Sequence, residues 1–506
     1  MEIKVIRGDI TKLSVDAIIV NLFEGTDHPG GATAAVDRAL GGIITELIAK
    51  GEIKGKLYEI TILHTLGRIQ PSRVVVVGLG KADDFNLDRV RGAAAEACRA
   101  LSKTDSQKVA TIVHGAGAGG LEPEQAARAV AEGSLLGTYA FRRHLTKPPD
   151  HKDIQELQIV ESDDSKLPDL ERGCSLGGVM AEATNLARDL VNEPANFMTP
   201  AILAERAKDL AQDEGLECEV LEPDQMRELG MGALLGVAQG SHQPPRLIIL
   251  RYRGDGSAES ALGIIGKGIT FDSGGISIKP SEGMGDMKGD MSGAAAVIAA
   301  MQAIARLKPR INVTALVPAT ENLPGGSAFK PGDVLQALNG KTIEIASTDA
   351  EGRLILADAL SYARKLGLSP LVDLATLTGA CHVALGNLYS GAFSNSQELL
   401  DRVVKAGEEA GERHWPMPLP EEYKEHNKSD VADIKNVGGR WGGAITAALF
   451  LAEFSEDTPW VHLDIAGTFH TDKDRDYLVK GATGVGVRSL VNLALSLAQD
   501  GEGGSL

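Results

Sequence analysis

The sequence predicts an α/β protein with two domains, a smaller one at the N-terminus and a larger one after it. Short apolar runs alternate with segments of helical periodicity along most of the 506 residues. Apolar residues make up 43% of the chain, aromatic residues only 4%, and there are 59 glycines. This composition excludes a disordered chain and is typical of α/β proteins whose strands are buried on both faces.

The N-terminal part, residues 1–150, alternates between the two kinds of segment. A GxGxxG pattern, Gly115 to Gly120, follows its last strand, but no second strand ending in Asp or Glu follows within about 20 residues, as a dinucleotide site requires. We therefore expect a tight strand–helix turn there. The predicted strands are 15–21, 73–78 and 108–114, and the predicted helices are 32–49, 85–102 and 122–140.

The boundary between the two domains is expected at 146–172. This segment contains prolines and a mixed-charge run, and it lacks the apolar periodicity of a buried helix or strand. A helix at 175–191 would follow, so the chain divides into a first domain (1–150), a linker with its connecting helix (151–192) and a second domain (193–506). The second domain alternates again. Its predicted strands are 246–252, 261–266, 311–316, 370–374 and 460–464, and its predicted helices are 201–214, 292–306, 354–365 and 443–454.

Charge and cysteine content exclude several classes of function. The net charge of −18 argues against nonspecific binding to nucleic acid or anionic membranes through overall charge. No signal peptide and no apolar run long enough for a membrane span is visible, and the four cysteines show no CxxC spacing. We therefore expect a cytoplasmic protein with reduced thiols and no membrane partner.

Two segments concentrate residues capable of chemistry. The first, 264–296, follows an apolar strand and is rich in glycine; the second, 347–354, places two carboxylates two positions apart and then opens an apolar helix with an arginine. Such charges at strand ends of an α/β sheet mark a site. The residues are Lys267, Asp272, Lys279, Asp290, Asp349, Glu351 and Arg353.

Several carboxylates gathered in one place without compensating arginines favour the binding of cations. Oxygen-rich ligand sets with few histidines suit zinc, manganese or magnesium, often in pairs. Two metal ions can polarise a carbonyl group and supply hydroxide near neutral pH. Solvated loop charge around glycines is the alternative reading of the same residues.

The two segments, FDSGGISIKPS and TDAEGRL, resemble the signatures of the leucyl aminopeptidase family, the cytosolic dizinc aminopeptidases. Further matching segments occur in the order that the family has, at 188–194, 375–380, 436–443 and 462–468. The resemblance implies a hydrolase that removes the N-terminal residue from short peptides. It also implies a homohexamer, a dimer of trimers whose active sites face an internal cavity.

The resemblance also assigns metal ligands, residue by residue. The tight site would use Lys267, Asp272, Asp290 and Glu351, and the exchangeable site would use Asp272, Asp349 and Glu351. Asp272 and Glu351 would then bridge two divalent ions, Zn²⁺ or Mn²⁺, with Mg²⁺ as a further possibility. A lysine amine binds a metal only when it is neutral, and an adjacent dication disfavours its proton.

Two residues receive catalytic roles from the resemblance. Arg353 would hold a bicarbonate that acts as general base toward the metal-activated water, and Lys279 would polarise the scissile carbonyl. The pocket for the first side chain should be apolar and accept Leu or Met. It would be lined by Met287, Thr376, Leu377, Gly379, Ala466 and Phe469.

Three positions depart from the family pattern. Ser347 stands where Asn is usual, Ser292 stands where a second Gly is usual, and Phe469 stands where relatives often have Met or Ala. Ser347 precedes Asp349 and can alter the geometry of that loop, whereas Phe469 can narrow the pocket. The preferred N-terminal residue is therefore open.

Two other functions remain as alternatives. Gly8-Asp9-Ile10-Thr11, residues 16–21 and Gly30-Gly31 resemble the macro-domain pattern, although the loops match only in part, so we expect that fold without its ligand. Calorimetry with ADP-ribose tests the alternative. The second alternative is sequence-specific DNA binding by the oligomer, tested by gel shifts at physiological salt; the available basic residues are Lys50, Lys54, Lys56, Arg142, Arg143 and Lys147.

Overall fold

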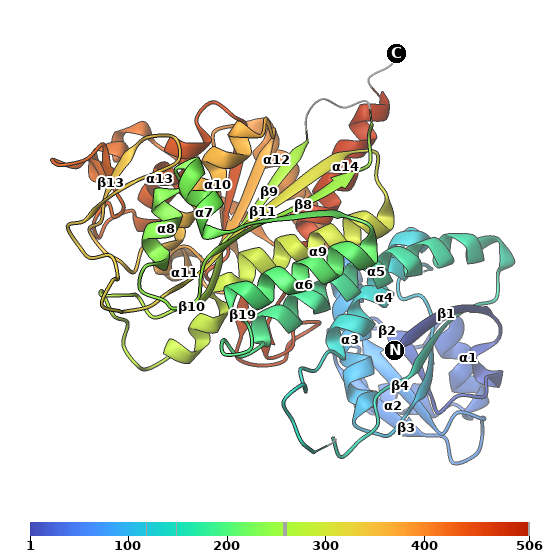
Figure 1. The fold of residues 1–506 in the computed structure, drawn as a ribbon. Coiled ribbons are helices and arrows are strands. Elements are labelled where there is room, and N and C mark those ends of the chain that lie inside the picture. Colours follow the sequence, from blue (N-terminus) through green and yellow to red (C-terminus); the bar gives the residue numbers. More distant parts are fainter. Residues whose placement is uncertain (118, 148, 257–260, 504–506) are drawn as a thin grey trace. The chain divides into compact units, whose positions relative to one another are not determined.

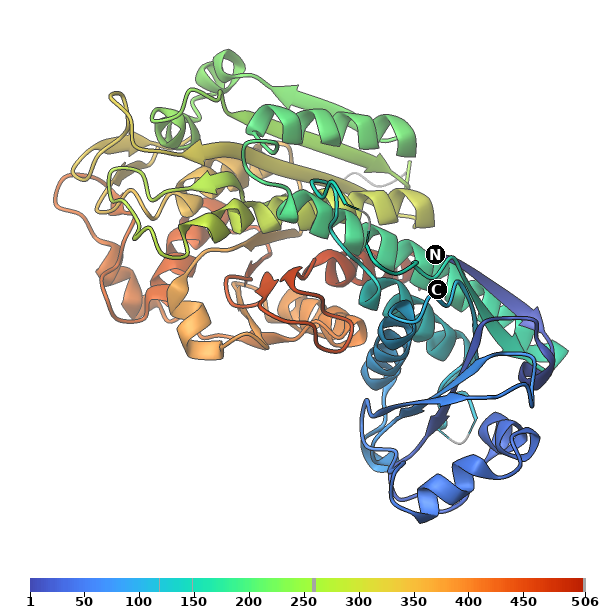
Figure 2. The ribbon, with the colours of Figure 1, turned by 90° about the horizontal axis from the view of Figure 1, so that it is seen from below.

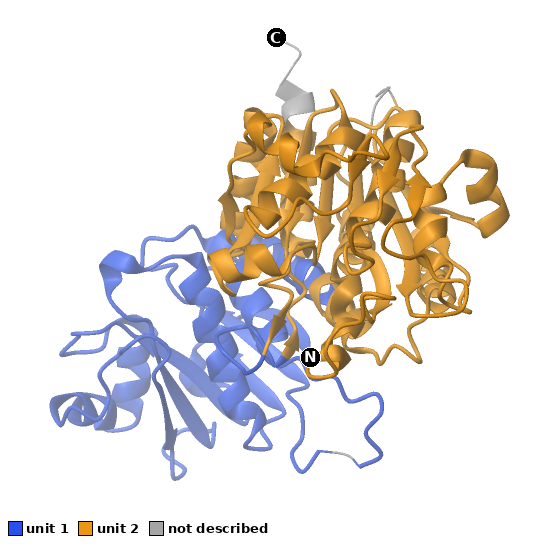
Figure 3. Cartoon of the chain, turned by 90° about the vertical axis from the view of Figure 1, so that its left-hand side faces the viewer, with its two compact units in different colours: residues 1–182, 472–480 blue, residues 183–471, 481–506 orange. Residues whose placement is uncertain are grey.

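The computed structural model describes residues 1–117, 119–147, 149–256 and 261–503. The chain divides into two compact units, coloured separately in Figure 3. Unit 1 comprises residues 1–182 and 472–480, and unit 2 comprises residues 183–471 and 481–506. The chain passes from one unit to the other within α5 (Leu167–Asn192), which begins earlier than the predicted helix at 175–191. Each unit has its own sheet and core, as the predicted two-domain α/β fold requires.

Unit 1 is built on a six-stranded sheet with the order β1-β6-β5-β2-β4-β3 (Figure 1). Only β3 runs antiparallel to its neighbour, and the other pairs are parallel. The valines and isoleucines of the central strands are almost fully buried, which explains their continuous apolar runs. The strands are β1 (Glu2–Arg7), β2 (Ala17–Leu22), β3 (Ile60–His64), β4 (Arg73–Gly78), β5 (Lys108–Thr111) and β6 (Glu156–Glu161).

The expectation that 146–172 lacks a core pattern is wrong, because β6 lies within it. This strand pairs in parallel with both β1 and β5, so it is an interior strand of the sheet. Leu157 and Ile159 are fully buried, whereas Glu156 at the strand's start pairs with Lys4 of β1. Charged residues at both ends of the strand and its short apolar run hide the core pattern in the sequence.

The predicted helix at 32–49 is two helices, α1 (Gly31–Ala39) and α2 (Ile43–Ala49). Gly41 and Gly42 separate them with φ values of +80° and +85°, a left-handed conformation that ends a helix and that glycine adopts readily. The next helices lie close to the predicted ranges. They are α3 (Leu87–Ser102) and α4 (Pro123–Gly137).

The GxGxxG segment is a longer connection than the predicted tight turn. β5 ends at Thr111 and α4 begins at Pro123, and part of the connection lines a cavity of about 680 Å³. Gly8 and the pair Gly30-Gly31 line the same cavity. The absence of an ADP-ribose ligand there stays a prediction.

Unit 2 contains a nine-stranded mixed sheet with the order β16-β15-β18-β14-β9-β11-β8-β7, and β10 pairs with β11 beyond the end of β9. The strands from β18 to β11 are parallel, whereas β7, β8 and β15 introduce antiparallel pairs. The strands are β7 (Glu217–Leu221), β8 (Arg246–Arg253), β9 (Leu262–Gly266), β10 (Gly268–Asp272), β11 (Asn312–Asn322), β14 (Leu371–Ala375), β15 (Ser390–Ser394), β16 (His414–Pro416) and β18 (Trp460–Asp464).

Helices cover both faces of this sheet (Figure 1, Figure 2). α8 (Gly232–Ala238), α10 (Gly352–Lys365) and α13 (Gly443–Ser455) share a large apolar core with one face. The helices packed elsewhere against the sheet or against one another are α6 (Pro200–Glu214), α9 (Ser292–Leu307), α12 (Gln397–Ala410) and α14 (Val487–Gly503). Shorter elements are α7 (Pro223–Leu229), α11 (Gly379–Leu385), β12 (Val334–Gln336), β13 (Thr342–Glu344), β17 (Ile434–Lys435), β19 (His470–Thr471) and β20 (Gly481–Ala482).

The parallel strands of unit 2 end in polar residues at one edge of the sheet. Lys267 follows β9, Asp272 ends β10, Asn322 ends β11, Thr376 follows β14 and Asp464 ends β18. Ligand sites of α/β sheets lie at the carboxyl ends of the strands. The topology therefore gathers these five side chains at the edge where a site is expected.

Two smaller expectations concern thiols and membranes. All four cysteines are free, as predicted; Cys98, Cys174 and Cys381 are buried, and Cys218 is partly exposed. Within the ranges that the structure describes, no helix has both the length and the apolar character needed to span a lipid bilayer.

Candidate functional site

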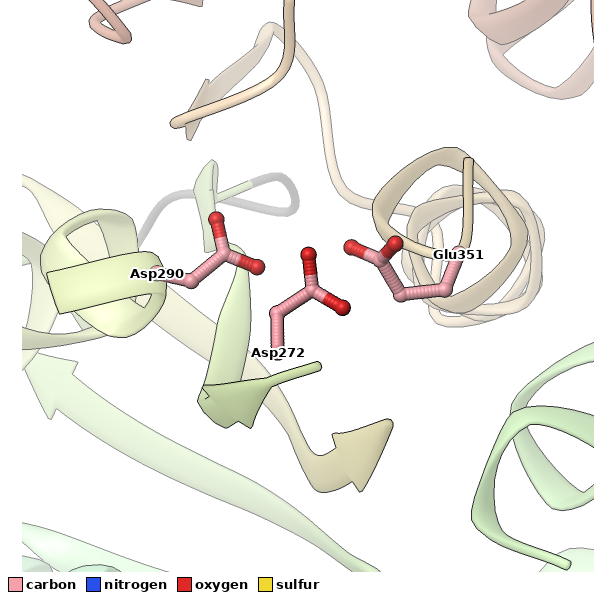
Figure 4. A group of neighbouring side chains, drawn as sticks. All are labelled: Asp272, Asp290 and Glu351. Carbon is pink, nitrogen blue, oxygen red and sulfur yellow. The ribbon is translucent and has the colours of Figure 1, made fainter. Parts of the chain in front are cut away.

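Three buried carboxylates of unit 2 point toward one another. Asp272 comes from the end of β10, Asp290 from the short 3-10 helix at Met284–Met291, and Glu351 from the residue before α10 (Figure 4). One oxygen from each lies within 4.8 Å of the others, and each residue is at most 7% exposed. Segments 264–296 and 347–354, which are distant in the sequence, thus build one acidic centre.

Lys267 joins two of these carboxylates. Its Nζ lies 2.8 Å from Asp290 Oδ2 and 2.9 Å from Glu351 Oε1, and it donates to the carbonyl oxygen of Thr376 at 2.9 Å. Burial alone would lower the pKa of Lys267, but the charges of Asp290 and Glu351 outweigh it and hold the pKa above the usual value. Gly352 makes this arrangement possible, because a Cβ there would lie 2.5 Å from Lys267 Cε.

Lys279 makes the corresponding contacts at the more open side of the centre. Its Nζ lies 2.8 Å from Asp272 Oδ2 and 2.5 Å from Asp349 Oδ1. The Asp349 side chain is 39% exposed, so it lies at the mouth of the site and outside the group of three buried carboxylates. The fold therefore brings together the predicted metal ligands and Lys279 in two groups. Lys267 contacts Asp290 and Glu351, and Lys279 contacts Asp272 and Asp349.

The charges of this centre fit divalent cations. Four carboxylates share only two ammonium groups, and three of the four are buried. Burial raises the pKa of Asp290 well above its usual range and also raises those of Glu351 and Asp349. Ionised carboxylates that are buried together require more positive charge than the lysines supply, and oxygen donors suit zinc, manganese or magnesium.

Arg353 lies on the first turn of α10 and is 8% exposed. One guanidinium nitrogen donates to the carbonyl oxygen of Asn436 at 2.6 Å, whereas Nε has no hydrogen-bond partner among the described residues. Burial lowers the pKa of Arg353 to about 10. A buried guanidinium with an unused donor beside a helix N-terminus can hold a small anion.

Asp464 organises part of the predicted substrate pocket. Its Oδ1 accepts hydrogen bonds from the backbone N–H of Leu377 and that of Ala466, each at 3.2 Å. Its Oδ2 accepts from the hydroxyl of Thr378 at 2.7 Å. Thr376, which lies two residues earlier, donates from Oγ1 to Asp290 Oδ1 at 2.7 Å, which ties this loop directly to the acidic centre.

The remaining predicted pocket residues lie on neighbouring segments. The ring of Phe469 lies against Gly289, where a Cβ would be 2.5 Å from the ring, and Gly289 is two residues from Met287. Both Phe469 and Met287 are partly exposed. Gly379 is exposed and begins α11.

The two serine departures have local structural roles. Ser347 Oγ accepts a hydrogen bond from the backbone N–H of Asp349 at 3.2 Å, which shapes the loop that carries this carboxylate. Ser292 Oγ donates to the carbonyl oxygen of Gly289 at 2.6 Å at the start of α9.

Sequence reasoning missed the buried asparagines that surround the carboxylates. Asn322 Nδ2 donates to Asp272 Oδ1 at 2.8 Å, to the carbonyl oxygen of Thr348 at 3.0 Å and to Glu351 Oε2 at 3.4 Å. The Asn436 side chain holds the backbone of residues 346–350. Asn322 lies beyond the strand predicted at 311–316, so the sequence gives no signal for it, whereas Asn436 lies in a segment already matched to the family.

Comparisons with known proteins relate the whole chain to one family. The profile of the cytosol aminopeptidase family, catalytic domain, matches residues 185–491, and that of its N-terminal domain matches residues 19–148. A probable cytosol aminopeptidase of Solibacter usitatus is 50% identical over 98% of this chain and 99% of its own. One from Alkaliphilus metalliredigens is 47% identical over 98% of this chain and 100% of its own.

Two solved structures have the same fold over almost the whole chain. A mutant of tomato leucine aminopeptidase superposes with a TM-score of 0.87 at 34% identity, covering 98% of this chain and 96% of its own. The bottromycin maturation enzyme BotP in complex with Mn superposes with a TM-score of 0.84 at 35% identity, covering 96% of this chain and 100% of its own. The chain is a member of the cytosol aminopeptidase family and, as such, a metal-dependent aminopeptidase.

Proposed function

We propose that the protein uses two divalent metal ions to hydrolyse the N-terminal residue, preferably Leu or Met, from short peptides. The observation that carries this proposal is the buried group of Asp272, Asp290 and Glu351, which Lys267 and Lys279 neutralise only in part. Mn²⁺ and Zn²⁺ are the proposed ions, with Mg²⁺ as a further possibility; a neighbouring structure was solved with Mn.

The proposed ligand sets share two bridging carboxylates. Lys267, Asp272, Asp290 and Glu351 would hold the tight ion, and Asp272, Asp349 and Glu351 would hold the exchangeable one. The burial of Asp290 and the 39% exposure of the Asp349 side chain support this difference between the sites. When bound, such a metal pair polarises a carbonyl group and lowers the pKa of water to near neutrality.

Two cationic side chains would assist the reaction. Lys279 lies at the open side of the centre, from which its ammonium group can donate to the oxygen of the scissile carbonyl as negative charge develops there. The unused Nε–H of Arg353 would bind bicarbonate, whose oxygen would accept a proton from the attacking water. The N-terminal side chain of the peptide would enter the pocket formed by Met287, Thr376, Leu377, Gly379, Ala466 and Phe469.

The test is turnover of leucine p-nitroanilide by the purified protein with added Mn²⁺ or Zn²⁺. We expect hydrolysis by the wild-type protein and none by Asp272→Ala. Asp286→Ala is the matched control, because Asp286 is an exposed carboxylate on the same 3-10 helix as Asp290 and should leave activity unchanged. No turnover with any divalent metal, or full activity of Asp272→Ala, contradicts the proposal.

We further propose a cytoplasmic homohexamer whose enclosed active sites restrict substrates to short peptides, and light scattering of the purified protein tests the oligomeric state. DNA binding gains no support from the basic residues of unit 1. Lys50 pairs with Glu46 and Arg142 pairs with Asp153, so neighbouring carboxylates offset part of their charge.

A further inference from the structure

Asn322 connects the two carboxylates that the proposed function makes the bridging ligands. It ends β11 directly beside Asp272, its partner in the parallel register, and it is fully buried. Its amide nitrogen donates to Asp272 Oδ1 at 2.8 Å and reaches Glu351 Oε2 at 3.4 Å. One neutral donor group therefore lies between two carboxylates from different segments.

The orientation of the Asn322 amide is fixed by its surroundings. The nitrogen faces three acceptors, namely the two carboxylates and the carbonyl oxygen of Thr348 at 3.0 Å. The opposite orientation would place the amide oxygen against those acceptors, which is unfavourable in a buried site. The amide oxygen instead lies against Gly275, where a Cβ would be 2.7 Å away.

The remaining oxygen of each carboxylate is directed elsewhere. Asp272 Oδ2 lies 2.8 Å from Lys279 Nζ, and Glu351 Oε1 lies 2.9 Å from Lys267 Nζ. Each carboxylate is thus held by the same amide through one oxygen and presents its other oxygen to a cation. The hydrogen bond to Thr348 also ties Asn322 to the loop that carries Asp349.

We infer that Asn322 is a positioning residue for both proposed metal sites, because its amide fixes Asp272 and Glu351 as a pair in the orientation that binds cations. The inference rests on the proposed assignment of these two residues as ligands. Residues that orient metal ligands typically contribute about 10–100-fold to metal affinity. Loss of the amide should therefore weaken both sites together, even though Asn322 is not proposed to touch either ion.

The test is calorimetric titration of the metal-free protein with Mn²⁺. Asn322→Leu nearly conserves the side-chain volume but removes the N–H donors of the amide. Asn322→Ala removes the donors and most of the side-chain volume. We expect Mn²⁺ binding about 10–100-fold weaker in both variants, with circular dichroism verifying that each is folded. The control is Asn492→Ala, which removes a buried asparagine that bonds α12 through the carbonyl oxygen of Ala406 and should bind Mn²⁺ as the wild type does.

The outcomes separate the inference from the function on which it rests. If the wild-type protein binds no Mn²⁺, the proposed function fails. If the wild type binds Mn²⁺ and a folded Asn322→Leu binds it with the same affinity, Asn322 only fills space and the inference is overturned. If the Leu variant does not fold, the Ala variant decides in the same way, since wild-type affinity in Asn322→Ala also overturns the inference.

Discussion

The substitution Gly352→Ala places a methyl group against the lysine at the centre of the site. A Cβ at this position would lie 2.5 Å from Lys267 Cε and 2.6 Å from its Nζ. Non-bonded carbon atoms come no closer than about 3.5 Å without repulsion, so the end of the lysine would have to retreat by about 1 Å. Lys267 is 3% exposed and has little space into which to move.

The cost follows from the contacts that this retreat would disturb. Lys267 Nζ is held at 2.8 Å by Asp290, at 2.9 Å by Glu351 and at 2.9 Å by the carbonyl oxygen of Thr376. Losing one charge-assisted hydrogen bond costs about 1.5–3 kcal/mol, and water cannot replace it in a buried site. Alanine gains at most about 1 kcal/mol over glycine in a helix. The lost contact outweighs that gain, so we expect a net destabilisation of about 1–2 kcal/mol.

Urea unfolding of the metal-free protein measures the effect. The control is Gly178→Ala in α5, because a Cβ at Gly178 meets no atom within 4 Å and the substitution should stabilise the helix by up to about 1 kcal/mol. We expect the two variants to shift the free energy of unfolding in opposite directions. If Gly352→Ala is as stable as Gly178→Ala, the close packing of Lys267 against Gly352 does not constrain the site and the reasoning is refuted.

Two further predictions concern pH and specificity. Burial lowers the pKa of His414 to about 4, below its usual 6.5, so the unfolded chain takes up a proton that the folded chain excludes. Because of this proton uptake, the free energy of unfolding should decrease by up to about 3 kcal/mol as the pH is lowered from 6.5 to 4. Urea unfolding of His414→Gln should show a correspondingly weaker pH dependence, and identical profiles would contradict this. Phe469→Ala should widen the pocket and raise kcat/KM for phenylalanine relative to leucine p-nitroanilide about 10-fold; an unchanged ratio would show that Phe469 does not limit the pocket.

Sequence analysis predicts the strands of unit 2 best where a strand coincides with one continuous apolar run, and it predicts β11 only in part. The prediction ended a strand at 316, whereas β11 continues to Asn322 through Pro318. Proline lacks the N–H donor that an interior strand needs, which favours a strand end at this point. In the structure, one edge of β11 pairs with β9 as far as Leu316 and with β10 from Ala319 onward. Pro318 lies between these two paired stretches, where the partner strand changes.

The same error hid Asn322. A strand that stops at 316 leaves Asn322 in a loop, where a single asparagine carries no signal. Only the register with β10 places it beside Asp272, and register is a property of two strands rather than of one segment. The sequence analysis predicts no strand at 268–272, where β10 lies, so the residue that depends on this pairing is missed even though the site itself is anticipated.

The charged residues were easier to predict than the pairs they form. Carboxylates and lysines in glycine-rich segments identify a site from residue type alone, and all seven singled out in the sequence lie in unit 2. Their pairing depends on tertiary structure, since Lys267 joins Asp290 to Glu351 whereas Lys279 joins Asp272 to Asp349. Each lysine thus connects carboxylates from two different segments. These charge pairs therefore depend on how segments 264–296 and 347–354 fold against each other, and neither segment shows them by itself.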